Sequence, residues 1–432
     1  MEKTNNETYG MPNPENGNLT SFETLFANFS VKRTVHPVGQ GGFHTEEIHN
    51  NDPKGLPQLQ IVYDCGTTTR QQSLAPDAFD PAFEGLNKQI DILFLSHLDA
   101  DHVNRVSDLK CTNDIARVVL PLLDDECKVA TFLSGMAAGL NGMDIKDFKN
   151  LVFNPEKFFG GSTPILRVEP TPLDPQEGWS DNLDSIDIED LTESKDIPSF
   201  QPLKSSKFPL WRFIPFCFDE KNRQLLFLKK LRQCPAAKEV FKTLSDKNNL
   251  SEFWLDWVEN KENLEILKCI YKSLPGGTNG NSLMLYSGPK HAQQNISIER
   301  FFPDNNFETE KSKRAGCLYL GDMNLKAGNR KKTPFEVVQY ILQRIQTCEN
   351  NLDLIQIPHH GSQRSFHDKL LTLNTSVKYY FLSYGIGNSY RHPSPSVIKK
   401  LGDKAIRVTN ETSGFCTQYT FSDVNKKDSC QK

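Results

Sequence analysis

The stretch Leu95-Ser96-His97-Leu98-Asp99-Ala100-Asp101-His102 decides how this chain folds. It follows residues 90–95, a nearly continuous apolar run that is typical of a strand buried on both faces. Two histidines and two aspartates then occur within six positions, at the end of that strand. Imidazole and carboxylate groups that converge on one point bind divalent metal ions. The alternative is a polar loop in which Asp101 caps the next helix, but the residue types and spacing favour metal binding.

Two further segments have the same construction. Residues 318–322 (LYLGD) form an apolar strand that ends in Asp322, and residues 354–362 (LIQIPHHGS) form another that ends in His359 and His360. Ligand-type residues at the carboxyl ends of strands are typical of sites in layered α/β folds. Each segment alone is weak evidence, because a Gly-Asp turn and a histidine pair are both common. Their ordered combination predicts one metal centre.

The pattern along the chain predicts strands, then an insertion, then strands that alternate with helices. Residues 1–20 read as a flexible polar tail, and 30–160 as the first part of a mixed α/β domain. Residues 161–277 are expected to form an insertion or cap, made of an acidic loop (171–200) and helices (221–273). Residues 278–425 complete the domain. The cap is expected over or beside the strand ends that carry the ligands.

Composition excludes some classes of protein. The 432 residues are 37% hydrophobic and 24% charged, which is an ordinary globular balance. The net charge of −4 gives no general basic field for nucleic acid. The chain shows neither a signal peptide nor an apolar run long enough to span a bilayer, and its cysteines lack paired spacing. We therefore expect a cytoplasmic protein that does not bind membranes; nothing in the sequence identifies a protein partner.

Several segments in order resemble the metallo-β-lactamase superfamily, and within it the nuclease-like domain of the ComEC type. These segments are VGQG (38–41), YDCG (63–66), LSHLDADH (95–102), NSLMLY (281–286), LGD (320–322), PHHGS (358–362) and SYGIGNSYRHP (383–393). The resemblance implies an α/β fold, the αββα metallo-β-lactamase sandwich with a largely helical insertion. Its strand-end loops would hold one or two divalent ions.

The resemblance also implies how the ligands are shared. One site would use Asp101, His102 and one of the histidines 359 and 360, with the choice between them open. The other would use His97 and Asp99, and Asp322 would bridge the two ions. Asp64 is expected to orient a ligand by a hydrogen bond, although a turn-capping role is equally open.

The chain departs from the resemblance in ways that affect the metal. Asp99 replaces the second histidine of the common HxHxDH loop, and the histidine expected just before Ser282 is missing. Both changes exchange imidazole for oxygen, which favours manganese slightly over zinc. In addition, Gly42 stands where the ComEC type usually has aspartate, and the transmembrane channel of that type is absent.

The chemistry that follows is hydrolysis by a metal-bound hydroxide, most consistent with a phosphodiesterase or nuclease acting on DNA or RNA. The alternatives are a hydrolase of a small phosphodiester, nucleotide or lactone, and a metal-binding interaction module without turnover. Catalytic roles are expected for Asp101 and His392. Substrate contacts are expected from Arg364, Asn388, Tyr390 and Arg391.

His392 is expected to protonate the leaving oxygen. It follows a predicted strand and a glycine-containing loop, and Pro393 restricts its backbone. Its unperturbed pKa of about 6.5 suits proton transfer near neutrality. A hydrogen bond to the turn, or direct ligation of a metal ion, are the alternatives.

Overall fold

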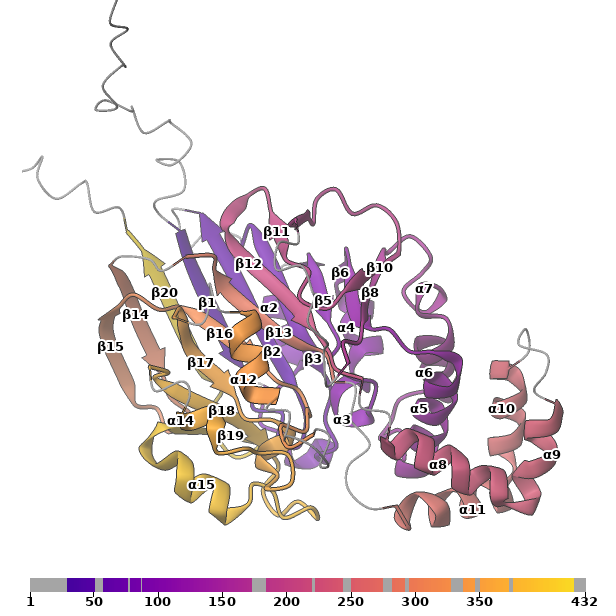
Figure 1. Ribbon diagram of the computed structural model, residues 1–432. Helices are drawn as coiled ribbons and strands as arrows, with labels where there is room; N and C mark the ends of the chain where they lie inside the picture. The colour runs from indigo at the N-terminus through magenta and orange to yellow at the C-terminus, as the bar shows by residue number, and fades with distance from the viewer. Residues whose placement is uncertain are drawn as a thin grey trace, which may run out of the picture.

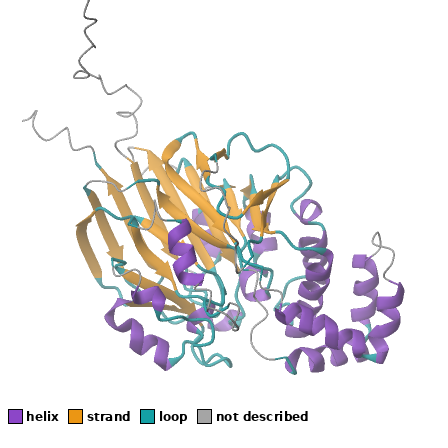
Figure 2. Cartoon of the chain, viewed as in Figure 1, coloured by secondary structure: helices purple, strands orange, loops and turns teal. Residues whose placement is uncertain are grey.

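The computed structural model describes residues 29–50, 57–76, 78–86, 88–172, 184–219, 222–243, 250–274, 282–291, 295–327, 337–345, 350–372 and 376–422. These residues form two large β-sheets that pack face to face, with helices on both outer faces (Figure 1). Figure 2 separates the central strands from the surrounding helices. Within these ranges, no helix is both long and apolar enough to cross a membrane.

The first sheet contains ten strands of the described residues. Its spatial order is β10-β8-β7-β5-β3-β2-β1-β20-β14-β15. The strands are β1 (Phe29–Val35), β2 (Phe43–Asn50), β3 (Leu59–Cys65), β5 (Ile92–Phe94), β7 (Val118–Pro121), β8 (Ile165–Glu169), β10 (Lys195–Pro198), β14 (Ile296–Phe301), β15 (Phe307–Ser312) and β20 (Phe415–Phe421). From β3 to β10 all neighbours are parallel, so their carboxyl ends meet at one edge.

The second sheet has the order β19-β18-β17-β16-β13-β12-β11-β9. Its strands are β9 (Ile186–Asp187), β11 (Leu203–Ser205), β12 (Phe208–Phe216), β13 (Met284–Pro289), β16 (Gly316–Tyr319), β17 (Leu352–Gln356), β18 (Tyr379–Tyr384) and β19 (Ala405–Thr409). The run β16 to β19 is parallel throughout. A small third pair joins β4 (Gln89–Ile90) to β6 (Asp114–Ile115).

Helices cover the outer face of each sheet. The first sheet is covered by α2 (Asp80–Gly85), α3 (Ala100–Val103), α4 (Val106–Thr112), α5 (Asp125–Ala138), α6 (Ile145–Phe153) and α7 (Pro155–Phe158). The second is covered by α12 (Val337–Arg344), α14 (Lys369–Thr372) and α15 (Pro395–Leu401). A third apolar cluster lies between the sheets. Because strand residues alternate sides, each sheet contributes to the central cluster and to one outer cluster. The αββα metallo-β-lactamase fold is confirmed.

The segment 161–277 differs from the expected insertion. Its residues 165–216 supply strands β8 to β12, which join both sheets. The stretch expected as an exposed acidic loop buries Ile188, Leu191 and Ile197 between the sheets. These isolated apolar residues gave too weak a periodicity to indicate short strands. The described helical part is therefore confined to 222–274, and residues 173–183 lie outside the described ranges.

That helical part comprises α8 (Asn222–Gln233), α9 (Pro235–Thr243), α10 (Leu250–Glu259) and α11 (Lys261–Lys272). It shares an apolar cluster with α5 and α6, the helices of the first sheet. Ion pairs between Lys149 and Glu252 (2.5 Å) and between Arg232 and Glu126 (2.5 Å) add to this contact. Figure 1 shows the four helices at the lower right, beside the end of the sandwich where α3 begins.

Candidate metal centre

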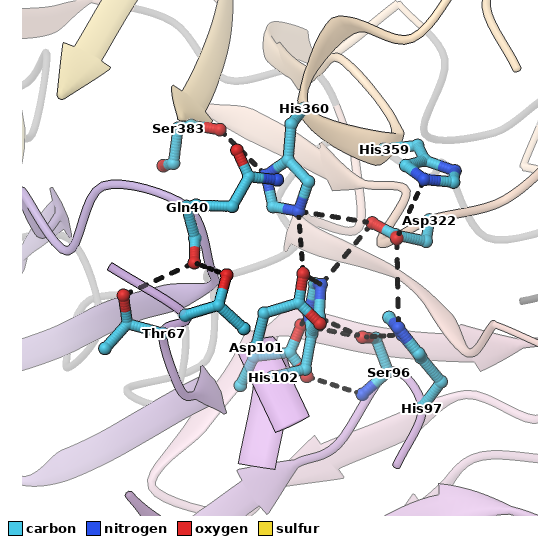
Figure 3. A network of polar contacts seen from close by, with 12 residues as sticks. Gln40, Thr67, Ser96, His97, Asp101, His102, Asp322, His359, His360 and Ser383 are labelled. Carbon is cyan, nitrogen blue, oxygen red and sulfur yellow. Dashed lines mark hydrogen bonds and ion pairs between the residues drawn. The ribbon is translucent and has the colours of Figure 1, made fainter. Parts of the chain in front are cut away.

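The candidate site lies where parallel strands of the two sheets end. His97, Asp101 and His102 follow β5, and Asp322 follows β16. His359 and His360 follow β17, in a tight turn where both residues have positive φ (53° each). Figure 3 shows these side chains pointing toward one another from opposite sheets. The sandwich thus joins three segments that lie far apart in the sequence.

Asp322 is the centre of this group. Its Oδ1 atom lies 3.4 Å from Nε2 of His102 and 3.9 Å from Nε2 of His360. Its Oδ2 atom lies 3.9 Å from Nε2 of His97 and 3.7 Å from Nε2 of His359. Asp101 extends the group, with Oδ2 3.3 Å from Nε2 of His360 and 3.9 Å from Nε2 of His102. Four imidazoles therefore present the same nitrogen to two carboxylates.

The opposite nitrogen of each imidazole has its own partner. Nδ1 of His102 donates to Asp64 Oδ2 (2.8 Å), and Nδ1 of His360 donates to the Ser383 carbonyl (2.8 Å). Nδ1 of His97 lies 2.9 Å from Ser96 Oγ, and Nδ1 of His359 lies 3.2 Å from Ser365 Oγ. Ligating histidines are held in this way in metal sites, because a proton fixed on Nδ1 leaves the Nε2 lone pair for the ion.

Buried polar atoms without a hydrogen-bond partner show that the residues fit a metal ion. Nε2 of His97 and Nε2 of His102 are such atoms, and both face Asp322. Leaving these two imidazole nitrogens unpaired is costly, whereas a cation between them and Asp322 would satisfy both. There are two groups in which the potential ligand atoms all lie within 4.8 Å of one another. They are His97–Asp101–His102 and His102–Asp322–His360. These residues would hold one or two divalent ions.

Asp64 makes the hydrogen bonds that the expected orienting role requires. Its side chain is fully buried, and its two oxygens accept from Ser96 N (2.6 Å) and Ser96 Oγ (2.7 Å) as well as from His102. Gly42 makes room for this contact, because a Cβ atom there would lie 3.0 Å from His102 Nδ1. Gly42, which departs from the ComEC pattern, thus keeps the space beside the Asp64–His102 contact open.

Charge coupling within the cluster explains its pKa shifts. Burial lowers the pKa of His97 to about 4, with a further contribution from His102. Burial also opposes protonation of His102, but the carboxylates of Asp64 and Asp101 outweigh it and raise the pKa. Burial would raise the pKa of Asp101, yet His102 and His360 lower it to about 2. The carboxylates are thus ionised, and a metal ion would displace protons from imidazoles.

The residues that were predicted in or near the segment 383–393 lie beside the candidate metal centre in different ways. The His392 ring lies 5.6 Å from that of His359 and 6.1 Å from that of Tyr390, between ring centroids. Burial and the His359 imidazole lower the pKa of His392 to about 4. Tyr390 and Arg391 are exposed beside it. Arg364 is also exposed, and its charge acts on His392.

Two predicted site residues, Asn388 and Asp99, have a less direct relation to the candidate metal centre. The Asn388 amide binds its own loop, donating to the carbonyls of Gly385 (2.8 Å) and His392 (2.5 Å) and accepting from His392 N (3.0 Å). Asn388 therefore shapes the loop that carries His392. Asp99 precedes α3 but belongs to neither compact group of ligand atoms in the described chain.

Several supporting residues escaped prediction from sequence. Ser282 Oγ accepts from Asp322 N (3.2 Å) and lies 3.4 Å from His97 Nδ1. Gln356 Oε1 accepts from the backbone N–H of Leu320 (2.9 Å) and of Gly321 (3.0 Å), which fixes the turn before Asp322. Serine and glutamine at strand ends give no distinctive signal, because only the tertiary contact identifies their role.

One comparison with known proteins, the match to a family model, agrees with the fold. Residues 60–175 match the sequence model of the metallo-beta-lactamase superfamily. One solved structure, described as a new diphosphatase from the PhnP family, aligns over 91% of this chain and 99% of its own, with 8% identity and a TM-score of 0.33. A similarity this low says nothing about the substrate. No curated protein matches the chain by sequence.

Proposed function

We propose that this chain is a metal-dependent hydrolase that cleaves phosphodiester bonds. The observation that carries the proposal is the buried group of ligand atoms around Asp322, in which Nε2 of His97 and Nε2 of His102 have no hydrogen-bond partner. A bound divalent ion lowers the pKa of a water molecule and neutralises charge on phosphoryl oxygens. Four imidazoles and two carboxylates at the meeting edge of two sheets are suited to hold such ions.

The residues around the centre would bind and orient the substrate. Asp101 and Asp322 would bring negative charge that balances the ions. Arg364 and Arg391, both exposed near the histidine segments, would contact phosphate oxygens. Tyr390, with 63% of its surface exposed, offers a flat ring on which a base or leaving group can stack. His392, held by its Asn388 contacts, would donate a proton to the leaving oxygen once the negative charge of a bound phosphate has raised its lowered pKa.

Nucleic acid is the proposed substrate within this class. The support is the ComEC-type closing segment, residues 383–393, which contributes the exposed Tyr390 and Arg391 and the neighbouring His392. The superfamily match covers residues 60–175 and does not reach that segment. Helices α8 to α11 are proposed as a wall of the site. Burial, Asp101 and then Tyr271 of α11 raise the pKa of Tyr390, which supports this placement of α11.

The test compares substrates and variants. Purified protein loaded with Mn²⁺ or Zn²⁺ would be given plasmid DNA, single-stranded DNA and RNA, and a chromogenic bis-phosphodiester. We expect cleavage by the wild type and none by Asp101→Ala or Asp322→Ala, which should also lose bound metal. Cleavage of the small diester alone would replace nucleic acid with a small substrate. No cleavage of any phosphodiester by fully metal-loaded protein would refute the proposal.

A further inference from the structure

The two oxygens of Asp322 face different pairs of histidines. Oδ1 lies nearest His102 and His360, and Oδ2 lies nearest His97 and His359. Donor atoms around one tetrahedral ion are about 3.3 Å apart for bonds of about 2.05 Å. The measured separations of 3.4 to 3.9 Å are close to this value and too long for strong hydrogen bonds. A carboxylate arranged in this way can bridge two ions.

We propose that the centre consists of a tight site and a looser site, and that His359 is the ligand that completes the looser one. The tight site would combine Asp101, His102, His360 and Asp322 Oδ1. The looser site would combine His97, His359 and Asp322 Oδ2. The inference rests on the proposed metal-dependent function, but its test does not need turnover.

The backbone explains how adjacent histidines can serve different sites. His359 and His360 both have φ of 53°, a left-handed conformation that is uncommon for residues other than glycine. Their ring planes are 86° apart and the ring centroids are 6.3 Å apart. The His359 N–H also donates to the Gly321 carbonyl (3.0 Å), which ties this turn to the one that carries Asp322. Strained backbone that persists at a site is consistent with a functional demand on it.

His359 also supplies the donor that the sequence lacks elsewhere. Residues 275–281 (PGGTNGN) contain neither histidine nor carboxylate. Ser282, which follows them, contacts His97 and Asp322 but brings no imidazole. With His359 in place, each site has two imidazoles. This composition is richer in nitrogen than the sequence indicated, and it suits zinc as well as manganese.

The looser site should bind its ion more weakly. His359 belongs to neither compact group of ligand atoms, and its side chain retains 21% exposure, whereas those of His360 and His102 retain 5% and 1%. Ligands that must move before they can coordinate reduce the binding free energy, because ordering them costs entropy. The two ions should therefore bind in two separate steps.

Metal binding by chelator-stripped protein tests this inference. Equilibrium dialysis against Mn²⁺ and Zn²⁺, with elemental analysis, would count ions for wild type, His359→Ala, His360→Ala and His367→Ala. His367 is the matched control, because it follows the same turn but lies outside the cluster. Electron paramagnetic resonance of Mn²⁺-loaded samples would report whether two ions interact magnetically.

We expect two ions in two steps for the wild type and for His367→Ala, with the spectrum of an interacting pair. His359→Ala should keep the first ion at unchanged affinity and lose the second, together with the coupled spectrum. His360→Ala should instead weaken the first step. Two ions of unchanged affinity in His359→Ala would overturn the inference and leave the proposed function standing. A wild type that binds no ion would overturn both.

Discussion

Replacing Asp64 by asparagine should weaken metal binding without removing a ligand. The wild-type carboxylate accepts three hydrogen bonds at 2.6 to 2.8 Å, from Ser96 N, Ser96 Oγ and His102 Nδ1. Asparagine keeps only one acceptor oxygen. Its backbone can keep the positive φ of 59°, because asparagine tolerates the left-handed region. The variant therefore changes hydrogen bonding at nearly constant shape.

The expected loss of metal affinity in Asp64→Asn follows from this geometry. If the amide oxygen stays on Ser96 N, its NH₂ group faces His102 Nδ1 and favours the tautomer with the proton on Nε2, where the ion should bind. If the amide turns over, Ser96 N loses its buried acceptor. Either arrangement costs about 1 to 3 kcal/mol. Loss of such an orienting partner typically weakens metal binding by about 10- to 100-fold, equivalent to about 1.4 to 2.8 kcal/mol.

The assay is competition of the protein with a chelating indicator for Zn²⁺ and for Mn²⁺, with thermal unfolding in chelator as a measure of the metal-free fold. Asp91→Asn is the matched control. Asp91 is also buried, accepts from Gln60 N at 2.7 Å, and lies at the opposite end of β5 from Ser96. The control should leave metal affinity unchanged. An Asp64→Asn protein that binds metal as tightly as the wild type would refute the orienting role.

Three further outcomes are expected. Gln356→Leu should lower the free energy of unfolding of the metal-free protein by about 1 to 3 kcal/mol, because two buried N–H groups lose their acceptor; unchanged urea denaturation would contradict this. His392→Ala should reduce kcat by about a hundredfold or more at unchanged metal content, whereas lost metal would indicate a ligand. Burial lowers the pKa of His36 and of His44 to about 3. Since both charge near pH 6.5 when unfolded, stability present above that pH should fall as pH decreases toward 3, by about 1.4 kcal/mol per unit for each histidine. His36→Gln should reduce this slope in urea titrations between pH 7 and 5, and an identical slope would disprove the assignment.

The sequence by itself determined the strands that carry the candidate ligands, and its resemblance to a known superfamily indicated the sandwich. Residues 90–95 predicted a buried strand, and β5 is buried throughout. The segments that end in Asp322 and in the histidine pair were likewise predicted as strands, and they form β16 and β17. These inferences succeeded because a buried parallel strand needs a local apolar run, and because ligands at its end lie within a few residues of that run.

Only the tertiary structure decided which residues meet. Asp64 and His102 are 38 positions apart, and His44 and Gln356, whose side chains lie 3.4 Å apart, are 312 positions apart. No local pattern can encode such contacts, since they arise when the two sheets close on each other. The same holds for β8 to β11, whose short apolar stretches become strands only against existing sheet edges. The tertiary structure also decided the directions of the two adjacent histidine side chains. His359 and His360 are identical in sequence, and the left-handed backbone of their turn sets where each imidazole points.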